Sequence, residues 1–186
     1  RNNPKALQTH ALHYVNQLTH EGKYPLTIWP YHSMLGGIGH ALVSAFEEAC
    51  FFHSIARNSP TQFELKGSNR LTENYSVLRP EVLVGQDGKA IAQKNTALIQ
   101  TLLDFDRVII AGQAKSHCVA WTIADLLTEI QATDASLADK VYLLEDCTSP
   151  VVVPGVVDFT EAAEAAFDRF AAAGMHVVRS TEALRS

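Results

Sequence analysis

Cysteine is scarce in this sequence. The 186 residues contain only Cys50, Cys118 and Cys147, an odd and widely spaced set without a C-x-x-C pair. Such a set excludes a regular disulfide framework and suits free thiols in a reducing compartment. We therefore expect a cytoplasmic protein.

The sequence also lacks a block of Lys and Arg and any long hydrophobic run. Its formal charge of −5 and pI near 5.9 argue against a protein that binds nucleic acid or a membrane surface, because such proteins carry a basic patch. No stretch approaches the eighteen or so apolar residues of a membrane span, and residues 1–8 are too polar for a signal sequence. We expect a small molecule as partner, with no role for nucleic acid or membrane.

Hydrophobic residues make up 47% of the chain, which at this length is enough for one well-buried domain and short of two. We predict a single domain over residues 1–186. The sequence begins at Arg1 and runs straight into a helical pattern, so we expect an N-terminal segment to precede it.

The second half alternates between short apolar runs rich in β-branched residues and longer amphipathic segments. This alternation indicates βαβ units, hence an α/β fold of three layers: a mostly parallel, doubly wound sheet with helices on both faces. We predict strands at 107–111, 140–144 and 176–179, with helices at 116–131 and 158–173.

The first half is less regular. Alternating polar and apolar residues predict a strand at 62–66, and a Gly-containing, hairpin-like loop is expected at 84–88. Helices are predicted at 6–18, 39–56 and 90–103, with a short extended run at 25–29.

Cys118 lies where a buried strand gives way to a helix that we expect to begin near Ser116. In parallel α/β sheets this end of the strand faces the ligand crevice. The unpaired N–H groups and positive dipole of a first helical turn stabilise a thiolate, and the same amides can hold an oxyanion. These features favour a nucleophile over the alternative, an ordinary buried thiol.

The other two cysteines and His117 are interpreted as non-catalytic residues. Cys50, inside an apolar helix, and Cys147, past a strand end, are interpreted as structural. His117 is adjacent to Cys118 in a helix, where successive side chains do not face one another, so we expect it on the helix surface rather than as the base. The group that deprotonates Cys118 must come from elsewhere in the chain.

The sequence of residues 112–119, GQAKSHCV, resembles the G-x-A-T-[DE]-x-C-V nucleophile turn of isochorismatase-like cysteine hydrolases, the family of the nicotinamidases. The resemblance implies a cis Gln113–Ala114 bond and an oxyanion hole made by the N–H groups of Ala114 and Cys118. Lys115 and Ser116 depart from the family's Thr and acidic residue, and Ser116 is itself a good helix N-cap.

Lys66 resembles the family's catalytic lysine, because it ends a predicted strand and is followed by Tyr75-Ser76. A cationic amine near a thiol favours the thiolate. The alternative is a solvated surface charge.

The run Trp29-Pro30-Tyr31-His32 resembles the W-P-x-H segment of nicotinamidases, whose His is a metal ligand. The resemblance implies that His32 binds one divalent ion, Zn, Fe or Mn, with open positions for water or substrate; polar surface is the alternative. Trp29 and Tyr75 offer flat faces to a planar heteroaromatic substrate, or else pack in the core or rim.

Two family segments have no match here. The family's catalytic Asp, in a V-I-D-x-Q type motif on the first, central strand, is absent, and so is the Asp-x-His that supplies its other metal ligands. Asp104 and Asp106 precede the nucleophile strand, at its wrong end. We expect both segments, with the first strand or strands of the sheet, to lie upstream of Arg1; a diverged, inactive relative is the alternative.

The leading functional hypothesis is hydrolysis of a small, nicotinamide-like carboxamide through a Cys118 thioester. Isochorismatase-type hydrolysis of a vinyl ether and a non-catalytic binding protein of the same fold are the alternatives. The family commonly forms homo-oligomers. The sequence does not name the substrate, the metal or the oligomeric state.

Overall fold

A parallel sheet forms the centre of the molecule in a computed structural model, which describes residues 3–21 and 24–184. Its strands are β1 (Val108–Ile110), β2 (Val141–Leu144) and β5 (His176–Val178), in the order β1-β2-β5. Val108 pairs with Val141, and Tyr142 pairs with His176. The parallel α/β sheet expected from the alternating pattern is confirmed.

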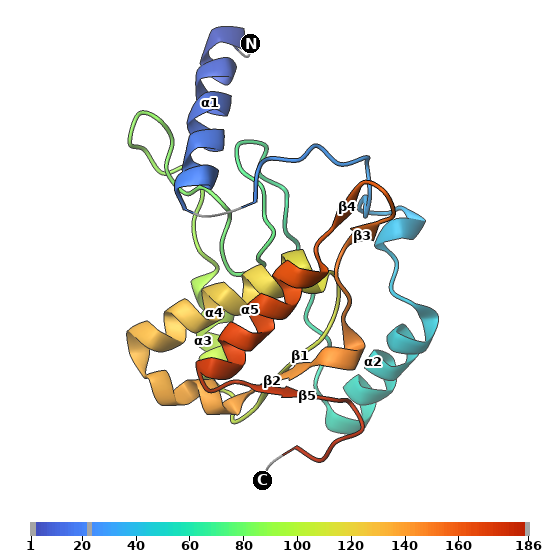
Figure 1. Ribbon diagram of the computed structural model, residues 1–186. Coiled ribbons are helices and arrows are strands. Elements are labelled where there is room, and N and C mark those ends of the chain that lie inside the picture. The colour runs from blue at the N-terminus through green and yellow to red at the C-terminus, as the bar shows by residue number, and fades with distance from the viewer. Residues whose placement is uncertain (1–2, 22–23, 185–186) are drawn as a thin grey trace.

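Helices lie on both sides of the sheet (Figure 1). α4 (Ala120–Thr133) and α5 (Thr160–Ala172) connect β1 to β2 and β2 to β5, and α3 (Thr96–Asp104) packs beside α4. Because successive right-handed crossovers put their helices on one face, the core forms between α3, α4, α5 and that face. Its fully buried side chains include Leu78, Ile123, Leu126, Ile130, Val141, Leu143 and Phe170.

The first part of the chain is looser. α1 (Pro4–His20) projects from one end of the molecule (Figure 1). Its N-cap is Asn3, whose side chain accepts a hydrogen bond from the N–H of Lys5. The helix buries Tyr14 and Leu18 against Val82 in a small second cluster. A 3₁₀ turn, η1 (Ile38–His40), precedes α2 (Ser44–Arg57). The predicted helix at 39–56 thus begins five residues later than expected, and the one at 90–103 begins at Thr96, where the Asn95 side chain caps α3.

The predicted strand at 62–66 is wrong, because these residues carry no regular secondary structure. A strand needs a neighbour for its backbone hydrogen bonds, and the described residues offer this run no pairing partner. The run at 25–29 is likewise irregular. The hairpin-like loop at 84–88 is confirmed by a bridge between Val84 and Ala90.

Two features of the second half were not anticipated. β3 (Val152–Val153) and β4 (Val157–Asp158) form a small antiparallel hairpin around Pro154 and Gly155. The predicted helix at 116–131 is divided into a single π-helical turn, η2 (Lys115–Val119), and α4. Short 3₁₀ turns, η3 (Ala135–Lys140) and η4 (Glu145–Cys147), flank β2.

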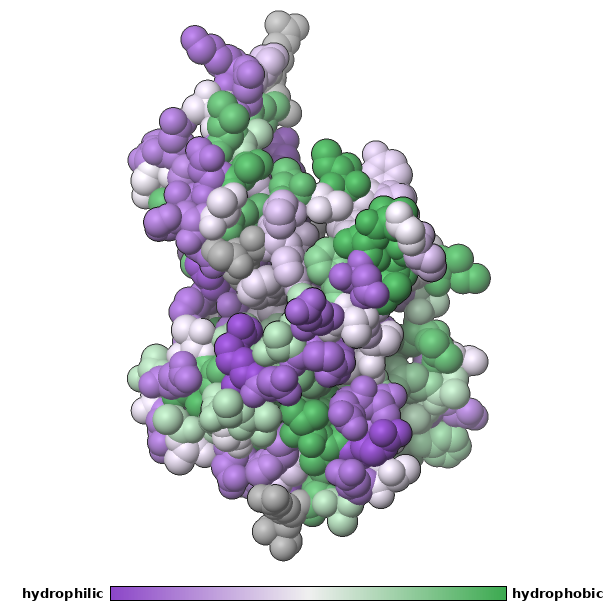
Figure 2. Space-filling view, viewed as in Figure 1, coloured by the Kyte–Doolittle hydropathy of each residue, from purple (hydrophilic) through white to green (hydrophobic). Residues whose placement is uncertain are grey.

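Apolar side chains are exposed throughout residues 25–66. No residue of α2 is buried, and Figure 2 shows hydrophobic groups at the surface on the right of the view, where this region lies in Figure 1. Ile109 of β1 is also 52% exposed, on the opposite sheet face from Val108. The large apolar side chains exposed in this region are Leu26, Ile28, Tyr31, Met34, Leu35, Ile38, Leu42, Val43, Phe46, Phe51, Phe52, Ile55, Phe63 and Leu65.

Over residues 3–21 and 24–184, no helix combines the length and apolar character required to cross a bilayer.

Candidate active site

The turn after β1 positions Cys118. Gly112 adopts a φ of 128°, which favours glycine, and the Gln113–Ala114 bond that follows is cis, as the resemblance predicted. The N–H of Gly112 donates to the carbonyl of Cys147 (3.1 Å), and that of Lys115 donates to the carbonyl of Ser149 (2.8 Å). The turn is therefore held against the segment that follows β2.

Cys118 lies inside the π turn η2 rather than in the first turn of an α-helix, which corrects the sequence interpretation. The carbonyl of Ala114 accepts hydrogen bonds from the N–H groups of His117 (3.0 Å) and Val119 (3.1 Å). These bonds tie the π turn to Ala114, the residue that precedes it. The Cys118 thiol is partly exposed and forms no disulfide. The nucleophile candidate is therefore a partly exposed cysteine in the turn that follows the carboxyl end of β1.

Lys66 contacts the Cys118 sulfur. Its Nζ lies 3.2 Å from Cys118 Sγ, 2.8 Å from the carbonyl oxygen of Asn74 and 2.9 Å from that of Tyr75. An ammonium group has three donors, and these acceptors use all three. The structure thus brings together two of the predicted site residues that lie 52 positions apart, and the ammonium faces the sulfur.

His117 is buried, so its expected place on the helix surface is wrong. Its ring lies 4.6 Å from Phe159, 4.9 Å from Tyr24, 5.6 Å from Tyr75 and 6.2 Å from Trp29, centroid to centroid. Its Nδ1 is 2.8 Å from Ser116 Oγ. Burial lowers the pKa of His117, so this aromatic enclosure favours the neutral imidazole.

Trp29 and Tyr75, the predicted substrate-binding residues, both belong to this aromatic cluster. The Trp29 side chain hydrogen-bonds to that of Tyr75. Burial, with the charges of Glu73, Glu81 and Cys118, raises the pKa of Tyr75 to about 12. Tyr75 is therefore a neutral phenol near pH 7, and two half-buried aromatic faces lie close to the nucleophile turn.

Among the described residues, no hydrogen bond or ring contact joins His32 to this aromatic cluster. His32 is exposed, and its Nδ1 bonds the carbonyl of Pro30 within its own loop (2.7 Å). The part of the chain that the structure describes contains no group of three His, Cys, Asp or Glu side chains able to hold a metal ion. The residues present do not by themselves fit a metal centre, and His32 as a ligand stays a prediction.

Within residues 3–21 and 24–184, the hydrogen-bond partner of Cys118 Sγ is Lys66, and no carboxylate bonds the thiol. Asp104 and Asp106 are exposed at the far end of β1, as expected. The predicted oxyanion hole would use the N–H groups of Ala114, which precedes the π turn, and of Cys118, which lies inside it. The site therefore contains a nucleophile, a cation and aromatic faces, without an internal base.

Solved structures with a similar fold were found by comparison. A nicotinamidase and pyrazinamidase of Acinetobacter baumanii matches with a TM-score of 0.51 and 19% identity, over 83% of this chain and 60% of that one. The yeast nicotinamidase bound to the inhibitor nicotinaldehyde matches with a TM-score of 0.52 and 20% identity, over 84% and 61%. The chain has the nicotinamidase fold.

A third similar structure is an L. infantum protein in complex with nicotinate, with a TM-score of 0.50 and 21% identity. The match covers 90% of this chain and 67% of that one. The chain thus spans about three fifths to two thirds of the length of these nicotinamidase-fold proteins. No family model and no curated protein matches the sequence.

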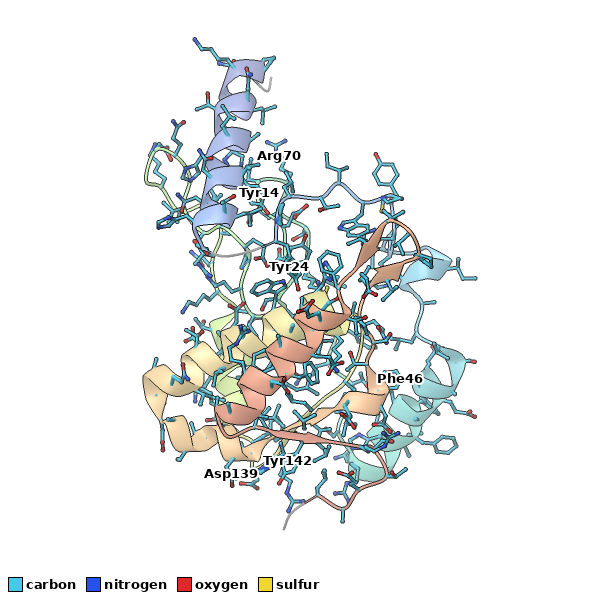
Figure 3. The ribbon with its side chains drawn as sticks, viewed as in Figure 1. Tyr14, Tyr24, Phe46, Arg70, Asp139 and Tyr142 are labelled. Carbon is cyan, nitrogen blue, oxygen red and sulfur yellow. The ribbon has the colours of Figure 1, made fainter. Side chains whose placement is uncertain are left out.

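Three residues of the site were missed from the sequence. The Tyr24 hydroxyl donates to the carbonyl of Ser116 (2.9 Å), and Figure 3 places Tyr24 above the start of α4 and α5. Phe159 makes an edge-to-face contact with His117, and Ser116 is fully buried, its Oγ accepting the N–H of Val151 (3.0 Å). Tyr24 and Phe159 lie far from His117 in the sequence, and only folding brings their rings into contact with it. Ser116 alone had a sequence signal, as the expected N-cap of the helix that follows β1.

Proposed function

We propose that residues 1–186 are one domain, the larger part of a cysteine amidase that lacks its N-terminal segment here, and that it hydrolyses a small carboxamide of the nicotinamide type. The observation that carries the proposal is the 3.2 Å contact between Lys66 Nζ and Cys118 Sγ, on a turn that exposes the sulfur. A thiol held against a cation, beside flat aromatic faces, suits attack on the carbonyl of a planar aromatic amide.

The proposed reaction has two halves. The Cys118 thiolate attacks the carbonyl carbon, a C–S bond forms, and the C=O electron pair moves to oxygen, where the N–H groups of Ala114 and Cys118 stabilise it. The intermediate collapses by breaking the C–N bond, and the leaving nitrogen takes a proton and departs as ammonia. Water then attacks the thioester and releases the carboxylic acid and the thiol.

Lys66 has an electrostatic role in this proposal. Its ammonium favours the thiolate over the thiol, because opposite charges a few ångströms apart stabilise each other. It cannot accept the thiol proton while it is itself protonated. The base that takes this proton and later gives it to the leaving nitrogen is proposed to be the aspartate expected upstream of Arg1.

We also propose that His32 binds a divalent ion. The described residues contain no group of three or more His, Cys, Asp or Glu side chains able to hold a metal ion, so no step of the reaction depends on it. Elemental analysis of the purified protein and of a His32→Ala variant measures whether metal is retained and whether His32 holds it.

The proposal also places the protein in the cytoplasm as a homo-oligomer. The three cysteines are free, which agrees with a reducing compartment. Sedimentation analysis measures the oligomeric state directly.

Ammonia release from nicotinamide by the full-length protein tests the reaction. We expect Cys118→Ala to abolish turnover and Cys147→Ala, which removes an exposed thiol elsewhere, to leave it unchanged. Full activity in Cys118→Ala overturns the proposal. Hydrolysis of a vinyl ether such as isochorismate with no amide turnover favours the isochorismatase alternative, and inactivity on both substrates with a thiol inert to iodoacetamide favours a binding protein.

A further inference from the structure

Glu81 is a buried acidic side chain that the proposed reaction does not use. It is 1% exposed, and its Oε1 accepts the N–H of Tyr75 at 3.0 Å. Its own backbone N–H donates to the carbonyl of Glu73 at 2.8 Å. Glu81 therefore holds the loop of residues 73–75 through both its side chain and its main chain.

The same loop supplies the acceptors that hold Lys66. The carbonyl oxygens of Asn74 and Tyr75 lie 2.8 and 2.9 Å from Lys66 Nζ. The carbonyl of Asn74 and the N–H of Tyr75 belong to one peptide group, and in a planar trans peptide these two groups point in opposite directions. The carboxyl of Glu81 and the ammonium of Lys66 thus bind opposite edges of a single peptide plane.

This arrangement fixes where the ammonium lies. Two of the three Lys66 donors are directed by the loop carbonyls, and the third reaches Cys118 Sγ. A rotation of the 74–75 peptide would move the Asn74 carbonyl away from Nζ and release a long, flexible side chain. Hydrogen bonds in a chain also polarise one another, so the bond from Glu81 strengthens the Asn74 carbonyl as an acceptor.

We infer that Glu81 is a positioning residue: by holding the N–H of Tyr75, it orients the 74–75 peptide, whose carbonyl sets the Lys66 ammonium against the Cys118 sulfur. The inference rests on the proposed role of Lys66 and Cys118. It assigns to Glu81 no contact with the substrate.

Site-resolved labelling of Cys118 by iodoacetamide across pH 5–9 tests this inference in the full chain, because the labelling rate follows the thiolate fraction and requires no amide hydrolysis. The variants are Glu81→Met, which keeps the side-chain length without an acceptor, Glu81→Gln, which keeps an acceptor oxygen, and Lys66→Met. Circular dichroism establishes that each variant is folded.

We expect Glu81→Met to slow labelling of Cys118 about three- to tenfold near pH 7, because the ammonium that favours the thiolate is no longer held against the sulfur. Glu81→Gln should label like the wild type. In the Lys66→Met background, Glu81→Met should have no further effect, because two residues that act through one contact are not additive.

The matched control is Glu73→Met. It removes a neighbouring carboxyl whose side chain contacts the Tyr14 hydroxyl instead of the Tyr75 N–H, and we expect normal labelling. A folded Glu81→Met protein that labels like the wild type, slow labelling of Glu81→Gln, or additive effects of Glu81→Met and Lys66→Met each overturn the inference. Normal labelling of Lys66→Met would instead overturn the proposed role of Lys66, so the two failures are distinguishable.

Discussion

His117 is enclosed by four aromatic rings, and this enclosure has a consequence for stability. Burial lowers the pKa of His117 in the folded protein, while the unfolded chain keeps the ordinary value of about 6.5. Below that value the unfolded state binds more protons than the folded state, so the free energy of unfolding falls as the pH falls from about 6.5. At higher pH the imidazole is neutral in both states and the effect disappears.

We therefore expect His117→Phe to reduce the loss of stability on acidification. The variant keeps a ring among Tyr24, Tyr75 and Phe159 and removes the titrating group. Urea unfolding at pH 7.5 and at pH 5.5 measures the difference for wild type and variant. The control is His32→Gln, which changes an exposed histidine; a pH dependence in His117→Phe as steep as in this control would contradict the account.

Among single residues, Cys118 was predicted from its turn motif. The strand expected to end at Lys66 does not form, and the contact of Lys66 with Cys118 agrees with the resemblance instead. Glu81 was not predictable, because its function depends on a hydrogen bond to Tyr75 that the sequence does not display. The predicted surface position of His117 was wrong because it was based on helix geometry alone. Rings contributed by distant segments bury its side chain.

At the scale of elements, Lys115 links the π turn η2 to α5 through an ion pair and a cation–π contact. The Lys115 side chain is 6% exposed, its Nζ lies 2.7 Å from Glu164 Oε1, and it sits 4.4 Å from the centre of the Phe167 ring. The residue that departs from the family's Thr therefore links the nucleophile turn to the helix that packs beside it.

Glu164→Ala should destabilise the protein by about 1–2 kcal/mol, because it leaves a buried ammonium without its carboxylate; removal of one partner of a fully buried pair costs more, and Glu164 is 58% exposed. Lys115→Met should cost less, since it removes the buried charge and keeps the apolar contact with Phe167. Chemical denaturation measures both. The control is Lys89→Ala, which breaks an exposed pair with Asp87, and equal losses in all three variants would refute the explanation.

The strands β1, β2 and β5 and the helices α4 and α5 were predicted to within a few residues, because buried parallel strands and amphipathic helices have strong periodic signals. The strand predicted at 62–66 failed for a different reason. Its alternation suits a strand, but Phe63 and Leu65 are exposed at 72% and 62%, and a sheet position depends on a neighbouring strand that local sequence cannot specify. The β3–β4 hairpin is too short for periodicity to reveal, although Pro154-Gly155 is a turn signal.

At the scale of the whole molecule, the apolar surface of residues 25–66 contrasts with the well-packed body of α3, α4 and α5. Contiguous apolar surface of this kind marks a region that associates with other surfaces or with dyes. On α2, Phe51, Phe52 and Ile55 are each more than 60% exposed.

The 186-residue protein should therefore bind the dye ANS strongly, and the double variant Phe51→Ser, Phe52→Ser should lower the fluorescence enhancement and the tendency to aggregate. Both side chains are more than 60% exposed, so the melting temperature should change little. The matched control is Phe167→Ser in the core of α5, which should lower the melting temperature. Weak ANS binding by the wild type would argue against an exposed apolar surface.

The central claim is that Cys118 attacks the carbonyl of a planar aromatic acyl compound. Exposure of the protein to p-nitrophenyl nicotinate tests it most directly, because this leaving group departs without a proton and acylation then needs no acid. Mass spectrometry of the quenched, digested protein should find a nicotinoyl group on the peptide that contains Cys118, and about tenfold less of it in Lys66→Met, because that variant lacks the cation that favours the thiolate. Equal acylation of Cys147, which is more exposed, or no adduct on Cys118, would contradict the account.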